Sequence, residues 1–234
     1  MKSSANPGWY SWGFTLTEVL VVLAIFAILI ALLIPAFRTV QESAFATKCS
    51  NNLKSIAVAG QAYAHDHNGE FTSISYHHDL DDTNSSGSPT PGFRAYLGFA
   101  KRVTGVDTVF TCPSLQKTHL TTNYAFNHNY GINAKATTYK PGGGGKEHLR
   151  GLKSWVNVET PSQMSYFMEG VGTPGSKGYV FADIYSTADR DKFHYPHRGK
   201  QQILFLDGHI AMMTAEDIAA IPDDDLFWTG RKKH

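Results

Sequence analysis

The chain contains few cysteines, few charges and no long run of charge of one sign. Its 234 residues include two cysteines, too few for a disulfide scaffold or for a zinc site made of cysteine alone. Charged residues make up 18% of the chain, below the usual ~25%, and the formal net charge is +1. This balance gives no indication of a nucleic-acid partner or of a polybasic membrane patch. The length leaves room for one membrane segment and one ordinary domain.

Catalytic and phosphate-binding motifs are also missing. No serine stands in a G-x-S-x-G elbow, and no pair of acids is spaced as a general acid and base. The glycine run 142–145 precedes Lys146, but Glu147 then breaks the pattern of a phosphate-binding loop, so the run predicts a flexible loop. His65-Asp66-His67 is interpreted as an exposed helix end. We therefore predict no enzymatic activity, no catalytic residue and no cofactor.

A hydrophobic run near the N-terminus is long enough to cross a membrane. Residues 14–34 would form about 32 Å of helix, close to the roughly 30 Å hydrocarbon core of a bilayer. Glu18 is the single charge in the run, and a carboxylate inside a membrane indicates a functional role. A secretory signal peptide has a shorter apolar core and a small-residue cleavage site, whereas this run continues directly into Pro35. A cleaved signal and a plain anchor are the disfavoured alternatives.

Beyond the span, the pattern predicts a second helical half that packs on a domain. Pro35 lacks an N–H, which predicts a kink or a locally melted turn. Apolar positions then recur at spacings of three or four residues, at Cys49, Leu53, Ile56, Gly60 and Tyr63. The opposite face carries Glu42, Lys48, Asn52 and Lys54. The helix is expected to stop at Asp66-His67-Asn68-Gly69, with Gly69 at positive φ.

The residues around Glu18 resemble the N-terminus of type IV prepilins and type II secretion pseudopilins. The resemblance rests on Gly13, the Phe14 that follows it, Glu18 and the unbroken apolar run. It implies that a prepilin peptidase cleaves between Gly13 and Phe14, that Phe14 is then N-methylated, and that Glu18 guides assembly. Members usually carry a basic residue before the glycine, where this chain has Trp12.

The remaining chain predicts a small sheet with long loops. Strands are expected over 108–111, 164–168 and 179–184, short helices over 93–99 and 215–221, and irregular or loop structure over 77–82, 84–89 and 123–133. The strongest pattern is a hairpin, in which apolar strands over 202–206 and 209–213 flank Asp207-Gly208 and predict a type I′ turn. Both strands are apolar on both faces, so they are expected in the middle of the sheet, with the long helix on one face.

The hairpin carries a second resemblance. His197 is followed by nine residues and then by Asp207-Gly208, which resembles the H-X9-DG domain found behind prepilin-type N-termini. The favoured interpretation of His197 is a structural hydrogen bond, for example to a loop carbonyl. A metal held by His197, Asp207 and His209, with His194, is the less favoured alternative. Calcium at Asp223-Asp224-Asp225 is disfavoured too, because a solvated acidic tail explains these residues better. No metal is predicted.

The two cysteines are a candidate pair. Cys49 lies on the helix face that packs on the domain, and Cys112 precedes a Pro-Ser turn. Disulfides form in oxidising compartments, and this one would close a loop of some 60 residues, worth ~4 kcal/mol in the chain-entropy model. Pairing is the favoured state, and two buried free thiols are the alternative.

Together these features predict an α+β, pilin-like fold in which one long N-terminal helix packs on a small antiparallel sheet. The expected parts are a leader (1–13), a transmembrane helix (14–35), an amphipathic helical half (36–68) and a globular domain (69–234) with the hairpin motif at 197–208.

The resemblance implies a pilin or pseudopilin subunit for type II secretion or a type IV pilus. Its implied partners are the prepilin peptidase, other pilin subunits, the inner membrane and the assembly platform of a secretion or pilus machine. The precursor is expected in the inner membrane with its globular domain in the periplasm, and the mature subunit in a periplasmic pseudopilus or surface filament. Two alternatives stay open. One is an anchored module that binds polysaccharide or a secreted substrate, for which Trp155, Tyr179 and Trp228 are candidate surface aromatics; the other is an anchored metal-dependent hydrolase using His197 and Asp207.

Overall fold

A computed structural model provides the three-dimensional structure. It describes residues 13, 15–72, 81–83, 89–98, 109–115, 130–133, 136, 154–170, 183–184 and 193–231. The leader before Gly13 and the glycine run 142–145 lie outside the described residues, as do Phe14 and Tyr179. The contacts within the chain divide it into two units, residues 1–43 and residues 44–234.

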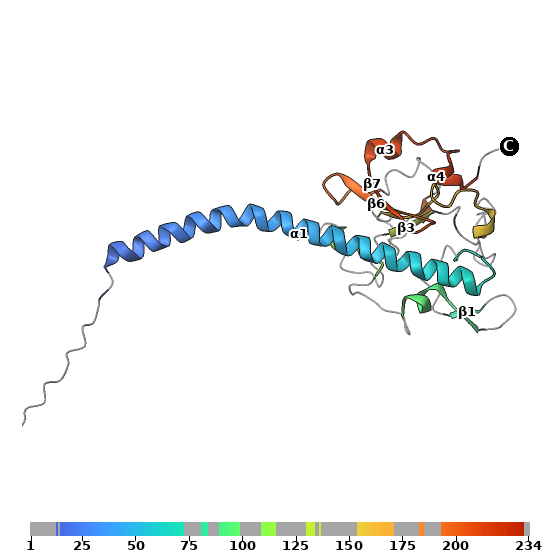
Figure 1. The fold of residues 1–234 in the computed structure, drawn as a ribbon, viewed down its shortest axis with the longest axis horizontal. Helices are drawn as coiled ribbons and strands as arrows, with labels where there is room; N and C mark the ends of the chain where they lie inside the picture. The colour runs from blue at the N-terminus through green and yellow to red at the C-terminus, as the bar shows by residue number, and fades with distance from the viewer. Residues whose placement is uncertain are drawn as a thin grey trace, which may run out of the picture. The chain divides into compact units, whose positions relative to one another are not determined.

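Helix α1 spans Leu16–Asp66 and contributes to both units (Figure 1). Its 51 residues confirm the prediction of one long N-terminal helix. Pro35 lies inside the helix, which stays helical on both sides of it, so the predicted melted turn is absent. Thr39 Oγ1 donates a hydrogen bond to the Pro35 carbonyl at 3.3 Å, one turn back along the helix.

The second unit is built on a five-stranded sheet in the order β5-β3-β4-β6-β7. The strands are β3 (Tyr130–Asn133), β4 (Ser165–Glu169), β5 (Asp183–Ile184), β6 (Lys200–Phe205) and β7 (Ile210–Thr214). Neighbouring strands run antiparallel except at one edge, where the two-residue β5 runs parallel to β3. A separate two-stranded ribbon pairs β1 (Asp81–Thr83) with β2 (Pro89–Pro91). The α+β class and the small antiparallel sheet are therefore confirmed.

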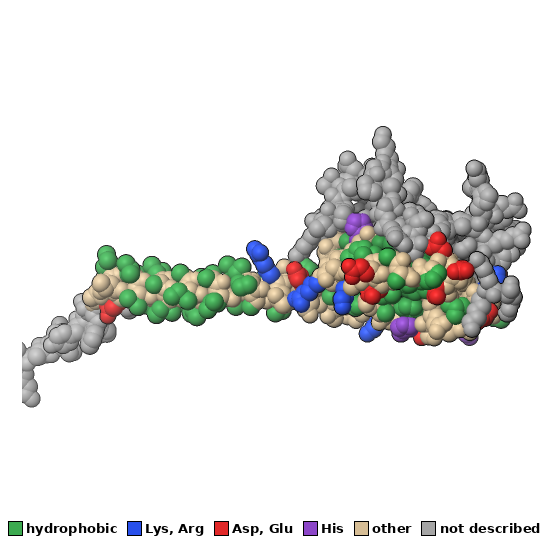
Figure 2. Space-filling model, turned by 90° about the horizontal axis from the view of Figure 1, so that it is seen from above, with side chains coloured by type: hydrophobic (Ala, Val, Ile, Leu, Met, Phe, Trp, Pro, Cys, Tyr) green, Lys and Arg blue, Asp and Glu red, His purple; other side chains and the backbone are tan. Residues whose placement is uncertain are grey.

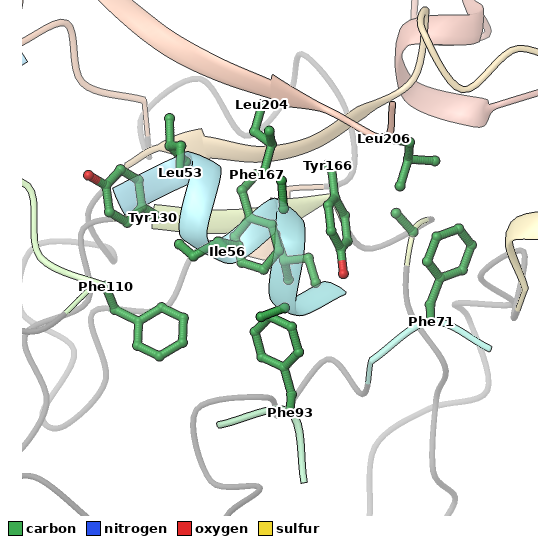
Figure 3. Close-up of a cluster of buried hydrophobic side chains, with 14 of the residues drawn as sticks. Leu53, Ile56, Phe71, Phe93, Phe110, Tyr130, Tyr166, Phe167, Leu204 and Leu206 are labelled. Carbon is green, nitrogen blue, oxygen red and sulfur yellow. The ribbon is translucent and has the colours of Figure 1, made fainter. Parts of the chain in front are cut away.

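Successive side chains along each strand point to opposite faces of the sheet, and a hydrophobic core lies on each face. On β6, Leu204 joins the larger core, whereas Ile203 and Phe205 join the smaller one. The larger core packs the second half of α1 against the sheet, through Leu53, Ile56 and their neighbours (Figure 3). The smaller core lies under α3 (Ala215–Ala219) and α4 (Leu226–Thr229), which contribute Ile218, Phe227 and Trp228.

Several local predictions are confirmed by the boundaries of these elements. The expected apolar stripe of α1 is buried throughout, and the helix ends at Asp66 with Gly69 at φ +78°. The expected strand over 164–168 is β4, and the helix over 93–99 is the 3₁₀ helix η1 (Phe93–Leu97). A second 3₁₀ turn, η3 (Trp155–Asn157), follows Ser154, whose side chain accepts a hydrogen bond from Val156 N. Helix α3 begins at a capping box formed by Thr214 and Asp217.

Other local predictions are wrong. A turn at Val109-Phe110, followed by the helical turn 113–115, replaces the strand expected over 108–111. Strand β3 occupies Tyr130–Asn133, where irregular structure was expected. The loop expected around Asp81 and Pro89 contains β1 and β2. Asn52 is buried rather than exposed, because its side-chain amide donates to the Thr111 carbonyl at 2.9 Å.

The hairpin forms, and β6 lies inside the sheet as predicted, but the turn type and the position of β7 differ from the prediction. Phe205 N donates to His209 O and Gly208 N to Phe205 O, so the loop has three residues. Of these, Gly208 alone has a positive φ, +92°, which fits a type I turn followed by a glycine bulge rather than type I′. Among the described strands β7 pairs with β6 alone, so it is an edge strand of this sheet, and its side chains are partly exposed.

Candidate functional site

The N-terminal motif begins with a capping box. The Glu18 carboxylate accepts hydrogen bonds from Thr15 N and Thr15 Oγ1, both at 2.8 Å, while Glu18 N donates to Thr15 Oγ1 at 3.3 Å. These reciprocal contacts satisfy backbone N–H groups that the first helical turn leaves without partners. Sequence reasoning missed this role of Thr15, although the Ser/Thr-x-x-Glu spacing from Thr15 to Glu18 is the usual signal for it.

After the capping box, the first unit presents hydrophobic side chains to all sides. The most hydrophobic 18-residue window of α1 has no buried residue, and α1 is the one described helix that is long and apolar enough to cross a membrane. Figure 2 shows hydrophobic side chains covering this segment on the face in view. A helix that is apolar all round requires an apolar environment, which a bilayer or packed copies of the same helix supply.

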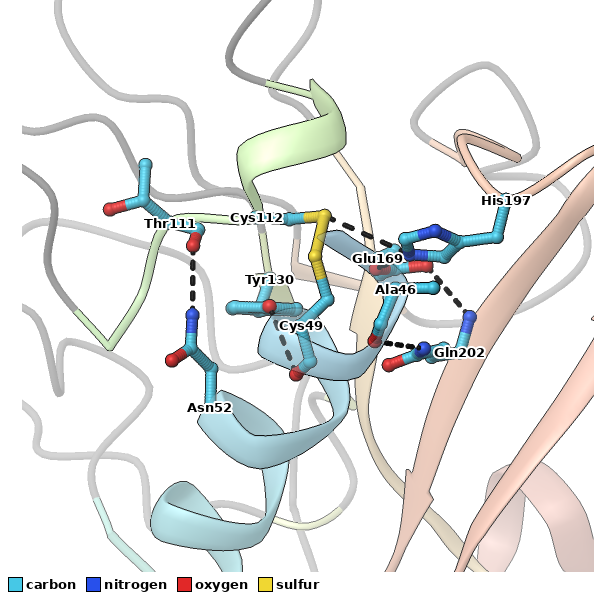
Figure 4. The surroundings of a disulfide bond; sticks show 9 residues. All are labelled: Ala46, Cys49, Asn52, Thr111, Cys112, Tyr130, Glu169, His197 and Gln202. Carbon is cyan, nitrogen blue, oxygen red and sulfur yellow. Dashed lines mark hydrogen bonds and ion pairs between the residues drawn. A yellow bond between two sulfur atoms is a disulfide. The ribbon is translucent and has the colours of Figure 1, made fainter. Parts of the chain in front are cut away.

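The second unit holds a buried cluster of four side chains with chemically reactive or ionisable groups: Cys49, Cys112, Glu169 and His197 (Figure 4). Cys49 and Cys112 form a disulfide, with their Cα atoms 5.1 Å apart. His197 Nε2 lies 2.7 Å from Glu169 Oε1 and 3.8 Å from Cys112 Sγ. All four residues are at most 7% exposed.

Four separate segments position these side chains, and Cys112 lies directly before the helical turn 113–115. Cys49 lies on the buried stripe of α1, whose Ala46 carbonyl accepts a hydrogen bond from Gln202 Nε2 on β6 at 2.8 Å. Glu169 is the last residue of β4. His197 stands in a tight turn before β6, closed by paired backbone hydrogen bonds with Lys200 and containing Gly199 at φ +77°. Residues more than a hundred positions apart therefore meet at one point.

The electrostatics of the cluster centre on Glu169. Burial removes water from its carboxyl group and raises its pKa above the ordinary value. The hydrogen bond and charge of His197 and the N–H of Gln202, 2.7 Å from Oε2, act in the opposite direction and favour the carboxylate. A buried carboxylate with partners on both oxygens is a stable arrangement, whereas removal of one partner leaves an uncompensated group.

The residues of the predicted hairpin motif do not meet. His197 pairs with Glu169 rather than with a loop carbonyl, and Asp207 pairs with His209 instead. Asp207 Oδ1 accepts from His209 N at 3.1 Å and lies 2.6 Å from His209 Nδ1, while the His209 ring stacks on Phe205. Gly208 supplies the positive φ of the turn. The structure therefore offers no support for a hydrolase centre formed by His197 with Asp207.

The C-terminal acidic segment is exposed to solvent, as expected, and one of its aspartates also has a structural role. Its three aspartates are exposed, but Asp225 Oδ1 accepts from Phe227 N at 2.8 Å and caps α4. Trp228 is fully buried, and Trp155 is half-buried against Phe71, so neither is an exposed aromatic of a binding surface.

Glu169 is the functional-site residue that sequence reasoning overlooked. The available signal was its place in the sequence SYFME, where an acid ends an otherwise buried strand. Such an acid requires a partner inside the protein, but local sequence does not reveal that the partner is His197, 28 residues away.

The comparisons with known proteins bear on the N-terminal motif alone. The family described as the prokaryotic N-terminal methylation motif matches residues 13–34. No curated protein and no solved structure gives a significant match to the chain. The motif supports a protein of the pilin or pseudopilin type, with a membrane-anchored precursor. It implies processing by a prepilin peptidase and assembly with other pilin subunits.

Proposed function

We propose that this chain is a filament subunit, cleaved between Gly13 and Phe14, N-methylated at Phe14 and assembled through the first half of α1. One observation carries the proposal: Glu18, the single charge of the apolar run, stands inside the matched motif at the head of a helix segment without buried residues. A lone acid is costly in lipid and becomes tolerable when it meets a positive charge. In a filament, the α-amino group of Phe14 in a neighbouring subunit supplies that charge.

The proposal assigns the chemistry at Gly13 to a separate peptidase, so the chain is a substrate and not an enzyme. The precursor is placed in the inner membrane with its globular domain in the periplasm, and the mature subunit in a pseudopilus or a surface pilus. The disulfide supports this location, because disulfides persist in oxidising compartments. The machine is type II secretion or a type IV pilus, whose assembly platform extracts the cleaved subunit from the membrane.

The capping box allows a sharp test of the role of Glu18. In Glu18→Gln the side chain still accepts the Thr15 hydrogen bonds, because glutamine also serves at this position of a capping box. The variant loses only the charge. We expect it to insert and to be cleaved like the wild type, but to stay in the membrane pool instead of entering filaments.

The matched control is Thr15→Val, which removes the hydroxyl of the cap and keeps the charge. We expect this variant to enter filaments. The measurement is the ratio of filamentous to membrane-bound protein for each variant, with cleavage followed by mass spectrometry. Normal assembly of a normally cleaved Glu18→Gln protein would contradict the proposal, as would a failure of assembly in Thr15→Val alone.

A further inference from the structure

The buried cluster presents two sulfurs, one imidazole nitrogen and one carboxylate oxygen to a common point. One ligand atom from each of Cys49, Cys112, Glu169 and His197 lies within 4.8 Å of every other. In a tetrahedral zinc site, metal–ligand distances of about 2.0–2.3 Å place the ligand atoms roughly 3.3–3.8 Å apart. Cys112 Sγ and His197 Nε2 are already 3.8 Å apart, whereas His197 Nε2 and Glu169 Oε1, 2.7 Å apart in a hydrogen bond, must separate by about 0.6 Å to admit the ion. We propose that, when the disulfide is reduced, these four side chains bind one zinc ion in a closed structural site.

The orientation of His197 distinguishes a metal site from a nucleophilic triad. In a cysteine–histidine–acid triad the acid holds one ring nitrogen and the nucleophile meets the other. Here Nε2 faces both Glu169 Oε1 and Cys112 Sγ. Because one nitrogen approaches both the oxygen and the sulfur, all three atoms become ligands of one ion once the Nε2–Oε1 hydrogen bond opens to ligand spacing. The burial of all four residues also matches a closed structural site rather than a catalytic one with an open position.

The supporting contacts are already in place. Glu169 Oε2 accepts the Gln202 N–H at 2.7 Å, so the carboxylate is oriented while Oε1 points at the cluster. Partners of this kind fix the direction of a metal ligand and strengthen binding. The Cα atoms of Cys49 and Cys112, 5.1 Å apart, allow the sulfurs to separate by side-chain rotation. Two thiolates, an imidazole and a carboxylate suit zinc among the common divalent ions.

The two states are related by a balanced reaction. Two equivalents of a small-molecule thiol break the sulfur–sulfur bond by supplying two electrons and two protons, so that Cys49 and Cys112 become thiols and the two reductant molecules become one disulfide. Zinc then displaces both thiol protons into solvent. The newly synthesised chain starts in the reduced state and needs no such step. The cluster therefore stabilises the domain in either redox state, by a covalent bond when oxidised and by an ion when reduced.

The test uses the full-length chain in detergent, stripped of metal by a chelator and reduced by a phosphine. Co²⁺ is the probe, because tetrahedral thiolate coordination gives it visible ligand-field bands and a near-ultraviolet charge-transfer band. We expect one Co²⁺ per reduced chain, displaced by one equivalent of Zn²⁺, and neither band in the oxidised chain. Reduced chain without stoichiometric binding overturns the proposal.

Single substitutions test whether the ion is bound by these four side chains. Cys112→Ser and His197→Gln should each weaken Co²⁺ binding at least tenfold. Loss of a residue that only hydrogen-bonds to a metal ligand already costs tenfold or more in metal affinity, and loss of a ligand itself should cost no less. His209→Gln, which removes an exposed histidine from its own carboxylate pair, should bind like the wild type. Unchanged affinity in Cys112→Ser or His197→Gln places the ion elsewhere and overturns the proposal.

Near-ultraviolet circular dichroism of the reduced chain with and without Zn²⁺ covers the case in which reduction unfolds the domain. Recovery of the folded signal, or a rise of Tm on adding zinc, supports the site. A reduced chain that stays unfolded with zinc present, or whose Tm does not change, contradicts it.

Discussion

The two halves of α1 have the same backbone conformation and opposite surroundings. Residues 44–66 carry all nine buried residues of the helix, whereas residues 16–43 carry none. The second half has one apolar stripe, which its own domain covers. The first half carries the long apolar run, which has hydrophobic side chains on every side, and no described residue of the chain covers that run. One helix therefore serves two purposes, since its first half is completed by lipid or by other subunits and its second half by its own sheet.

The largest effect should follow from a change just before the exposed half. A Cβ atom added at Gly13 meets no described residue within 4 Å, so the Gly13→Val precursor itself should fold normally. The peptidase loses the bare glycine at its cleavage site, and we expect full-length precursor to accumulate. N-terminal sequencing should find methylated Phe14 in the wild type and no processing in the variant. The control is Gly8→Val within the leader, and cleavage of Gly13→Val at the wild-type rate would disprove the proposed processing.

The disulfide belongs to the covered half, because it links Cys49 of α1 to Cys112. Closing a loop with a sequence separation of 63 contributes ~4 kcal/mol in the chain-entropy model. The Cys49→Ala, Cys112→Ala double variant should therefore lose about 8–16 °C in Tm, at 2–4 °C per kcal/mol for a domain of this size. Alkylation before lysis should label neither thiol in the wild type. Full labelling of both would show that the thiols are free in the envelope.

A matched pair of leucine substitutions compares the two halves directly. Leu53 is fully buried, and Leu53→Ala should cost about 2–5 kcal/mol because it leaves a cavity in the larger core. Leu29 is 56% exposed, and Leu29→Ala should leave the unfolding of the domain unchanged. Thermal melts of both full-length variants in detergent check this difference. Equal losses of Tm would mean that the first half is also covered by the domain.

A smaller effect should come from Gly60, where the covered half of α1 packs tightly against Tyr166 of β4. A methyl group at Gly60 would lie 2.9 Å from Tyr166 Cε1, so Gly60→Ala should cost about 1–3 kcal/mol through overpacking. Tyr166→Phe alone should be neutral or stabilising, since the buried Tyr166 hydroxyl has no hydrogen-bond partner among the described residues. The double variant should recover part of the loss, because the phenolic oxygen would otherwise lie 3.0 Å from the new methyl group. Strict additivity of the two changes would show that this contact does not limit packing.

Prediction succeeded where the information is local or periodic. The spacing of the α1 stripe, the stop at Gly69 and the apolar run of β4 each concern a few consecutive residues, and the structure agrees with all three. Prediction failed where contacts with residues far away in the sequence determine whether a side chain is buried or where a strand lies in the sheet. Asn52 looks like a surface residue by periodicity, but the Thr111 carbonyl, 59 positions away, accepts its hydrogen bond inside the protein. The edge position of β7 depends on the order of strands, which apolar composition does not specify.

Local sequence is enough to specify the long helix, its division into an apolar half and a striped half, and the Gly13–Glu18 motif. These features follow from side-chain periodicity, hydropathy and short spacings, which the chain carries in any context. Long-range packing, by contrast, brings His197 to Glu169 and the cystine and leaves Asp207 with His209. The reason is that burial makes unpaired polar groups costly, and which groups pair depends on how the helix, the strands and the turn before β6 pack together.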